Sequence, residues 1–365
     1  MQKRRRLTWF VALLAVLTLV VAACAEEEEP AADGGENQPE QVDFLACQVT
    51  DTGGVDDRSF NQTAYAGMQR AEEELGVQID VLESQTPNDF ATHIQTFIDR
   101  GCDLIITVGF LLGDATAEAA EANPDQLFAI VDVDFLDFEA TPPEDVTFDN
   151  VKELTFQTDQ AAFMAGYLAA GMSQTGTLGT FGGINIPTVT IFMSGLEAGM
   201  NYYNEQKGGN VDLIGWDSEA QDGTFTGDFE NVDKGRQVSE ALIGDGADII
   251  LPVAGPVGEG TATAAQQAGD VSVIWVDTDG CVSVADFCDL FLTSIVKNMD
   301  VAVFDTIEEA LNDEFEGGLY VGTLENDGVG IAPFHEFEDD VPEELATEVE
   351  DLRAGIIDGS IPVSE

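Results

Sequence analysis

The chain has 365 residues with 44% hydrophobic content, and its 70 Asp and Glu against 13 Lys and Arg give a net charge of −57 at pH 7. That charge excludes nucleic acid as a partner and disfavours anionic ligands such as nucleotides, because like charges repel. The acids are spread along the whole sequence, so we interpret them as the solvated acidic surface of a salt-adapted protein. A chain of this length is too long for one compact core and predicts two lobes.

The first 23 residues have the pattern of an export signal. Basic residues at 3–6 precede an apolar run at 7–21, which is shorter than the roughly 20 residues that comfortably span a bilayer. Small residues then stand before Cys24, as in a bacterial lipobox, whose cysteine is lipidated and becomes the mature N-terminus. An ordinary signal with an incidental cysteine remains the alternative. We therefore expect residues 1–23 to be a lipoprotein signal peptide and Cys24 to anchor the protein outside the cytoplasm on the cell membrane.

The following segment, 24–41, is expected to be a disordered acidic tether. It contains no large apolar residue and is dominated by acids, Pro and Gly, so it cannot bury enough surface to offset its ordering entropy. As a coil of about 17 residues it would hold the folded body on the order of 20–25 Å from the membrane.

Two series of alternating strands and helices follow. In the first series we predict strands at 44–50, 77–82, 104–108 and 127–131 and helices at 62–75, 89–100 and 113–122. In the second we predict helices at 161–171, 189–205, 232–243, 258–268, 292–312 and 342–357 and strands at 177–181, 211–215, 248–253 and 271–276. Apolar strands joined by helices predict parallel sheets that are covered on both faces.

The order of these elements predicts a hinged α/β architecture with two lobes. We assign 42–152 plus 280–316 to the N-terminal lobe and 153–279 plus 317–365 to the C-terminal lobe. We expect the chain to cross between the lobes near 150–153, 277–279 and 317–321.

The cysteines and histidines indicate whether the protein could form disulfides, bind zinc or act as an enzyme. Cys47 and Cys102 lie in or beside apolar strands and are expected to be buried thiols, whereas Cys281 and Cys288 flank a short segment in which a local disulfide is an open possibility. Their spacing does not have CxxC character, which argues against zinc. The two histidines of the sequence, His93 and His335, fit no nucleophile–base pattern, so we expect no enzymatic activity.

Candidate binding residues follow the predicted strands, because ligands of such sheets bind beyond the carboxyl ends of the strands. Asp51, Asp132 and Asp277 each stand at such an end. Phe60 precedes a helix and would be an awkward exposed aromatic unless something stacks on it. The alternatives are that the aspartates cap helices and that Phe60 is a packing residue.

Five stretches of the chain resemble the basic membrane protein family, whose members are nucleoside-binding lipoproteins that supply ABC importers. The stretches are DTGGVDDRSFNQTAYAGMQ, DLIITVGFLLGDATAEAAEANPDQLFAIVD, FGGINIPTVTIFMSGLEAGM, GADIILPVAGPVGEG and LTSIVKNMDVAVFD. The resemblance runs from about residue 44 to the C-terminus and implies a periplasmic-binding-protein-like (type I) fold. The extreme acidity departs from the family's name but leaves these motifs intact.

The resemblance also implies a set of ligand-binding residues. In the family a purine base lies between two phenylalanines, while acidic residues and a lysine hold the base edge and the ribose. The matching positions here are Asp51, Phe60, Asn61, Asp132, Phe229, Asp277 and Lys297. Phe229 is matched through Phe229-Glu230-Asn231-Val232-Asp233-Lys234-Gly235, in which Asn231 replaces the usual Asp, and Phe225 and Trp216 are its competitors. Lys297 could instead be a surface charge on a helix.

The expected function is therefore that of a solute-binding lipoprotein, which binds a nucleoside, with purines expected, between two hinged lobes. Its expected partners are that ligand, ABC permease subunits and the membrane, with no cofactor, no metal and no nucleic acid, and the protein is expected to be a monomer. The alternatives are a binding protein for another small polar ligand such as a sugar, and a ligand-sensing receptor.

Overall fold

The computed structural model describes residues 41–137 and 144–363. The expected signal peptide, Cys24 and nearly all of the expected tether lie outside these residues. Within the described ranges, no helix combines the length and the apolar character that crossing a membrane requires.

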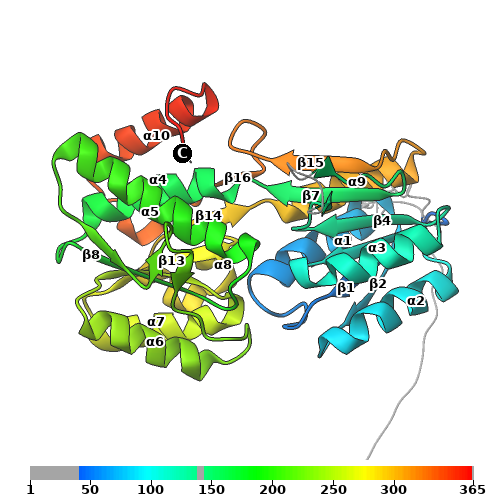
Figure 1. Cartoon of the computed structure of the whole chain (residues 1–365), viewed down its shortest axis with the longest axis horizontal. Helices are drawn as coiled ribbons and strands as arrows, with labels where there is room; N and C mark the ends of the chain where they lie inside the picture. Colours follow the sequence, from blue (N-terminus) through cyan, green and yellow to red (C-terminus); the bar gives the residue numbers. More distant parts are fainter. Residues whose placement is uncertain (1–40, 138–143, 364–365) are drawn as a thin grey trace, which may run out of the picture. The chain divides into compact units, whose positions relative to one another are not determined.

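The first of two six-stranded sheets is parallel throughout and has the order β15-β7-β4-β3-β1-β2 (Figure 1). Its strands are β1 (Leu45–Thr50), β2 (Gln78–Glu83), β3 (Leu104–Val108), β4 (Leu127–Val131), β7 (Val151–Phe156) and β15 (Gly318–Gly322). One face packs on α1 (Phe60–Leu75) and α9 (Met299–Leu311), the other on α2 (Phe90–Arg100) and α3 (Gly113–Ala122). We call this sheet with its helices the first lobe; it also carries the short pair β5 (Leu136–Asp137) and β6 (Glu144–Asp145).

The second sheet has the order β16-β14-β13-β12-β8-β9 and is parallel except for β16. Its strands are β8 (Thr177–Gly182), β9 (Asp212–Ile214), β12 (Ile249–Val253), β13 (Ser272–Asp277), β14 (Phe291–Lys297) and β16 (Val329–Ile331). Helices α4 (Thr158–Met172), α5 (Pro187–Lys207) and α10 (Glu343–Ile357) share one hydrophobic cluster with this sheet, and α6 (Val232–Gly244) and α7 (Gly258–Ala268) share the other. The second lobe also contains the short helix α8 (Gly280–Ser283) and the pair β10 (Trp216–Asp217) and β11 (Asp222–Gly223).

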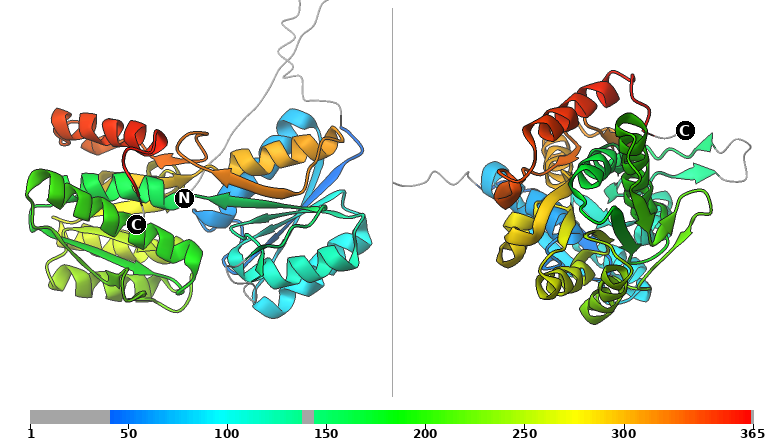
Figure 2. Two further views of the ribbon diagram at one scale, coloured as in Figure 1. Left: turned by 45° about the horizontal axis from the view of Figure 1, so that its top comes forward. Right: turned by 90° about the vertical axis from the view of Figure 1, so that its left-hand side faces the viewer.

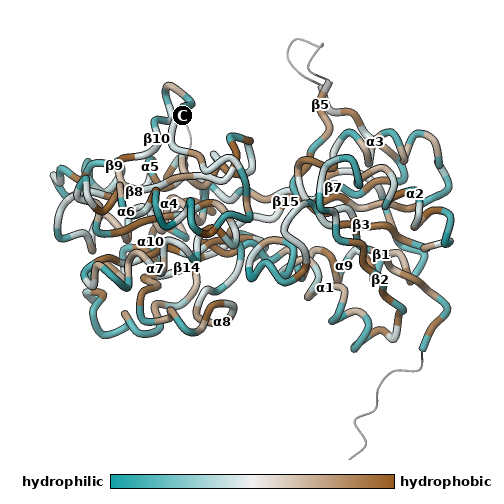
Figure 3. The backbone as a smooth tube through the Cα atoms, turned by 90° about the horizontal axis from the view of Figure 1, so that it is seen from below, coloured by the Kyte–Doolittle hydropathy of each residue, from teal (hydrophilic) through white to brown (hydrophobic). Residues whose placement is uncertain are grey.

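Burial explains why these segments fold as they do. All five residues of β3 are buried, as expected for a central parallel strand with helices on both faces. Along the surface helices, hydrophobic and hydrophilic residues alternate (Figure 3). Glycines let α4 and α5 touch: a Cβ at Gly166 would lie 2.1 Å from the Leu196 carbonyl oxygen, and one at Gly199 would lie 1.9 Å from that of Phe163.

The chain crosses between the two sheets at three places, which differ from the expected ones. The crossings lie between β7 and α4, at Asn298 between β14 and α9, and at 323–328 between β15 and β16 (Figure 2). The expected crossings at 150–153 and 317–321 instead lie at the starts of β7 and β15, and 277–279 stays within the second lobe. Likewise β14, expected in the N-terminal lobe and as part of a helix, is a strand of the second sheet. β7 and β15 carry half-exposed residues and so lack the apolar run that marked the inner strands.

The four cysteines of the described residues form two disulfides. Cys47 in β1 pairs with Cys102 just before β3, so the expectation of two free buried thiols was wrong. The pairing depends on β1 and β3 being neighbours in the sheet, which spacing along the chain does not reveal. Cys281 pairs with Cys288, which resolves the possibility that the sequence left open.

Candidate functional site

A cavity lies where the carboxyl ends of the strands of the two sheets face each other. It contains about 620 Å³ of space between atoms, part of it open to solvent. All the residues expected to bind ligand line it: Asp51, Phe60, Asn61, Asp132, Phe229, Asp277 and Lys297. The structure thus brings the set together from segments up to 246 positions apart in the sequence. Their contact with a ligand remains a prediction.

Asp57 organises the loop that connects β1 to α1. Its carboxylate accepts hydrogen bonds from the backbone N–H groups of Ser59 (3.0 Å), Asn61 (2.8 Å) and Gln62 (3.0 Å). These bonds satisfy N–H groups at the start of α1 that have no partner within the helix. Asp57 therefore sets the position of Phe60 at the cavity. Asp57 was not among the residues predicted from the sequence, although an acid just before a helix is a typical capping signal.

The amide of Asn61 connects this loop to the end of β1. Its Nδ2 donates to Asp51 Oδ1 at 2.8 Å and to Asp57 Oδ2 at 3.2 Å. Its Oδ1 is buried and has no hydrogen-bond partner among the described residues. A buried acceptor without a partner is costly, so this oxygen is available to a donor that enters the cavity.

Phenylalanines from both lobes provide the apolar part of the lining. Phe60 comes from the first lobe, and Phe229 comes from the second. Phe192 of α5 lines the cavity as well and was not among the expected residues. Phe192 lies near the start of the long helix α5, and this position indicates a cavity residue only when the arrangement of the two lobes is known.

Two glycines at the end of β8 explain how Phe229 is positioned. A Cβ at Gly183 would lie 2.3 Å from the Phe229 ring, and one at Gly182 would lie 2.7 Å from the Phe225 ring. The Phe-Gly-Gly sequence therefore allows the 224–229 segment to approach β8 closely. Phe225 packs edge-to-face on the buried Trp216, with ring centroids 6.1 Å apart. Of the three aromatic candidates, Phe229 is the one that lines the cavity.

A buried ion pair connects the lobes at the cavity. Lys297 Nζ at the end of β14 donates to Asp132 Oδ1, 2.6 Å away, just after β4, and the two residues are 1% and 8% exposed. The ammonium also lies 5.0 Å from the ring centroid of Phe60 and 5.8 Å from that of Phe192, within cation–π range. Lys297 is therefore buried on a strand, and the alternative of a surface charge on a helix was wrong.

Asp132 and Asp277 occupy matching places in the two sheets. Each stands at the carboxyl end of a central strand, with φ of 67° and 69° respectively, a left-handed conformation that aspartate tolerates better than most residues. The Ser59 hydroxyl of the first lobe donates to Asp277 Oδ2 at 2.7 Å. These two carboxylates thus bond across the lobes to Lys297 and Ser59, which is not the helix-capping role left open by the sequence.

Burial changes the proton affinity of the carboxyl groups. It raises the pKa of Asp51 to about 8, with the Asn61 hydrogen bond opposing the rise and the charges of Asp57, Asp132 and Asp277 adding to it. Burial raises the pKa of Asp277 to about 6, against the lowering effects of Lys297 and Ser59. Near neutral pH, Asp51 is therefore largely protonated and can donate as well as accept.

The geometry suits binding more than chemistry. Aromatic faces, carboxyl groups and one ammonium can hold a planar group by its faces and bond its polar edge. Neither described histidine lines the cavity: His93 bonds to Ser84, and His335 bonds to Asp279.

Known proteins resemble this chain over nearly its whole folded length. The family of ABC transporter substrate-binding proteins described as PnrA-like (Bmp) matches residues 44–365. A protein named CD4+ T-cell-stimulating antigen from Listeria monocytogenes is 32% identical, with 88% of each chain covered. The ABC transporter nucleoside-binding protein BmpA of Lactococcus lactis is 30% identical over 90% of this chain and 91% of its own.

Solved structures agree with this result. A solute-binding protein of an ABC transporter system from Aeropyrum pernix has a TM-score of 0.77 and 25% identity, with 87% of this chain and 92% of that chain covered. The expected two-lobed fold of the periplasmic binding proteins is thereby confirmed, as is the resemblance found in the sequence. The chain belongs to the Bmp family of PnrA-like ABC transporter substrate-binding proteins.

Proposed function

We propose that this protein is a lipoprotein that captures a nucleoside, with purine nucleosides as its expected ligands, and delivers it to an ABC permease. The observation that carries the proposal is the meeting of Phe60 and Phe229, from opposite lobes, in one cavity with four carboxyl groups and Lys297. The Lactococcus lactis relative, named as nucleoside-binding, supports the same ligand class.

Each part of the lining has a counterpart in a nucleoside. Stacking of a base on an aromatic side chain contributes about 1–3 kcal/mol. Ribose hydroxyls donate well to carboxylates such as Asp132 and Asp277. A protonated Asp51 beside the unpartnered Asn61 Oδ1 offers both a donor and acceptors to the polar edge of a base. A phosphate would meet these carboxylates and be repelled, so we expect nucleosides and not nucleotides.

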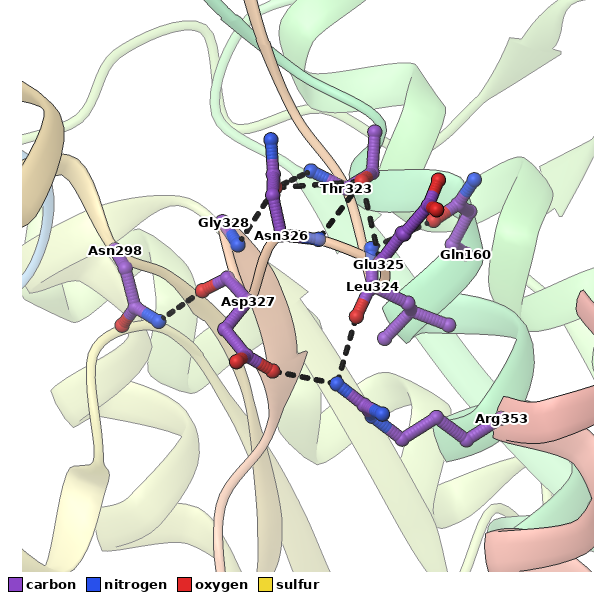
Figure 4. Close-up of polar contacts among 9 residues, drawn as sticks. All are labelled: Gln160, Asn298, Thr323, Leu324, Glu325, Asn326, Asp327, Gly328 and Arg353. Atoms are coloured by element: carbon purple, nitrogen blue, oxygen red, sulfur yellow. Dashed lines mark hydrogen bonds and ion pairs between the residues drawn. The ribbon is translucent and has the colours of Figure 1, made fainter. Parts of the chain in front are cut away.

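We propose that the lobes close on the ligand about the three crossing segments. Polar contacts hold the third crossing, 323–328, to the first turn of α4 and to the second crossing: Leu324 N–H donates to Gln160 Oε1 at 2.9 Å, and Asn298 Nδ2 donates to the Asp327 carbonyl (Figure 4). The Ser59–Asp277 bond joins the lobes at the cavity and would break on opening, whereas the Lys297–Asp132 pair lies beside the crossing at Asn298, where a hinge moves least. Binding is thus the whole task, and we expect no chemical change in the ligand.

We expect lipidation at Cys24 to anchor a monomer to the outer face of the cell membrane, where it meets the permease. The alternatives are a ligand such as a sugar and a sensing role.

Scattering and thermal unfolding together test the proposal. A saturating nucleoside should reduce the radius of gyration through hinge closure and raise the melting temperature by mass action. Monosaccharides and nucleotides should do neither. A melting temperature that rises with a sugar and not with any nucleoside would overturn the ligand class, and an unchanged radius with bound nucleoside would overturn closure.

A further inference from the structure

The two disulfides of the described residues lie in very different surroundings. Cys47 and Cys102 are 0% and 3% exposed, inside the hydrophobic cluster beneath α2 and α3. Cys281 and Cys288 are only partly buried, on α8 and the turn that follows it, next to Val282, which is 75% exposed. The second bridge therefore lies nearer to the surface of its lobe than the first, which lies in a hydrophobic core.

A histidine–aspartate pair lies beside the second bridge. His335 Nε2 and Asp279 Oδ2 are 2.7 Å apart, with side chains 31% and 23% exposed. Cys281 Sγ, a ring nitrogen of His335 and a carboxylate oxygen of Asp279 all lie within 4.8 Å of one another. Asp279 Oδ1 accepts a hydrogen bond from the Cys281 backbone N–H at 2.9 Å, which holds this turn in place.

These three groups are arranged more like a thiol-exchange site than a metal site. A metal would need Cys281 as a thiolate, and in the disulfide its sulfur is not one. A leaving sulfur does become a thiolate, however, and a protonated imidazole close to it stabilises that negative charge. His335 is placed to do this for Cys281.

We propose that Cys281–Cys288 is a reactive disulfide that exchanges with small thiols, with Cys281 as the leaving sulfur. A thiolate RS⁻ attacks Cys288 Sγ and forms an RS–S bond to it, while the Cys281–Cys288 bond breaks and its electron pair stays on Cys281 as a thiolate beside His335. A second RS⁻ attacks the sulfur of R in the mixed disulfide, releases Cys288 as a thiolate and leaves as RSSR. The reductant is therefore two equivalents of a low-molecular-weight thiol.

The Cys281–Cys288 bridge follows the cavity residue Asp277 closely in the sequence. Asp277 lines the cavity, and two residues later Asp279 begins the turn that the bridge closes. The exchange uses groups outside the cavity lining, so it holds or fails independently of the proposed ligand.

Differential alkylation tests the site. The mature protein is incubated with reduced glutathione, free thiols are trapped with iodoacetamide at intervals, and each cysteine is quantified by peptide mass spectrometry. Cys281 and Cys288 should become labelled while Cys47 and Cys102, the internal control, stay oxidised. The glutathione adduct should be found on Cys288. Equal rates for the two bridges, or an adduct mainly on Cys281, would overturn the proposal.

Two substitutions at His335 separate chemistry from exposure. His335→Gln keeps a polar side chain but removes the imidazole that can carry a proton beside the sulfur, and should slow the exchange by roughly threefold to tenfold because the leaving thiol becomes more basic. His335→Arg supplies a cation and should recover most of the rate. In a reduced Cys288→Ser protein, His335→Gln should also raise the pH at which the thiolate absorbance of Cys281 appears. A rate and a thiolate titration that His335→Gln leaves unchanged would show that exposure alone governs reduction.

Discussion

Lys297 and Asp132 form a buried ion pair between the lobes, from the end of β14 in the second sheet to the turn after β4 in the first. The lysine lies 5.0 Å from the Phe60 ring centroid and 5.2 Å from that of Phe156, so its charge is held by one carboxylate and aromatic faces. A charge pair this deep ties the geometry of the cavity to the relative position of the lobes.

Lys297→Met should therefore be strongly destabilising. The substitution leaves the Asp132 carboxylate buried without its partner, which typically lowers the free energy of unfolding by about 3–5 kcal/mol. Urea unfolding of the ligand-free protein measures this loss. The matched control is Lys207→Met, which breaks a more exposed pair with Glu348 and should change the free energy of unfolding far less, because solvent screens that pair. Equal effects of the two substitutions would contradict the role of the pair.

Aromatic truncation should distinguish the two proposed stacking residues from their competitor. Phe60→Ala and Phe229→Ala should each weaken nucleoside binding by about 1–3 kcal/mol, because each removes one face of the stack. Phe225→Leu is the control, since Phe225 packs on Trp216 outside the cavity lining. Isothermal titration calorimetry of the folded variants measures their affinities for the nucleoside. If Phe229→Ala bound normally and Phe225→Leu did not, the second stacking residue would be Phe225.

Stability should fall as pH rises, because burial raises the pKa of Asp51 to about 8 and that of Asp277 to about 6. Between the unfolded value near 4 and these folded values, the folded protein binds more protons than the unfolded chain. The stabilisation is thus fully present below pH of about 4 and is lost as pH rises through 6 and 8. Thermal unfolding of ligand-free protein across this range measures the slope, and Asp51→Asn should flatten its upper part. A slope that Asp51→Asn leaves intact would place the responsible group elsewhere.

Salt should stabilise the protein. The chain carries a net charge of −57, and repulsion among so many acids opposes the compact state until counter-ions screen it. Melting temperature should rise steadily from about 0.1 M to about 1 M KCl, over which the screening length falls from about 10 Å to about 3 Å. A melting temperature independent of KCl would contradict the interpretation of the acids as a salt-adapted surface.

The strands that alternate with helices in the two series were predictable from the sequence, and the strands next to the crossings between the lobes, such as β7, β14 and β15, were not. β3 and β4 begin and end at the residues predicted from the apolar runs. This agreement is expected because a strand covered by helices on both faces is apolar along its whole length. β7 and β15 are paired at one side of the first sheet, and their half-exposed residues hid them. In β14, the apolar residues continue directly into α9, so one helix was predicted where a strand and a helix lie in different lobes.

The site shows the same contrast. Residues at strand ends and in matched motifs, such as Asp51, Phe60 and Lys297, could be named because parallel strands place their carboxyl ends at one edge. Ser59 and Phe192 could not, because their importance depends on the approach of the opposite lobe. Asp57 acts through the backbone of its own loop and carried a local signal that was overlooked.

Isothermal titration of the mature protein with adenosine, adenosine 5′-monophosphate and ribose tests the central claim most directly. We predict one site per chain for the nucleoside with a free energy of about −8 kcal/mol or better, which corresponds to micromolar or tighter affinity. The nucleotide should bind far more weakly, since its phosphate meets the carboxylates of Asp132 and Asp277. Ribose should lack the stacking contribution and show no measurable heat. Binding of ribose without binding of adenosine, or of any other nucleoside, would contradict the account.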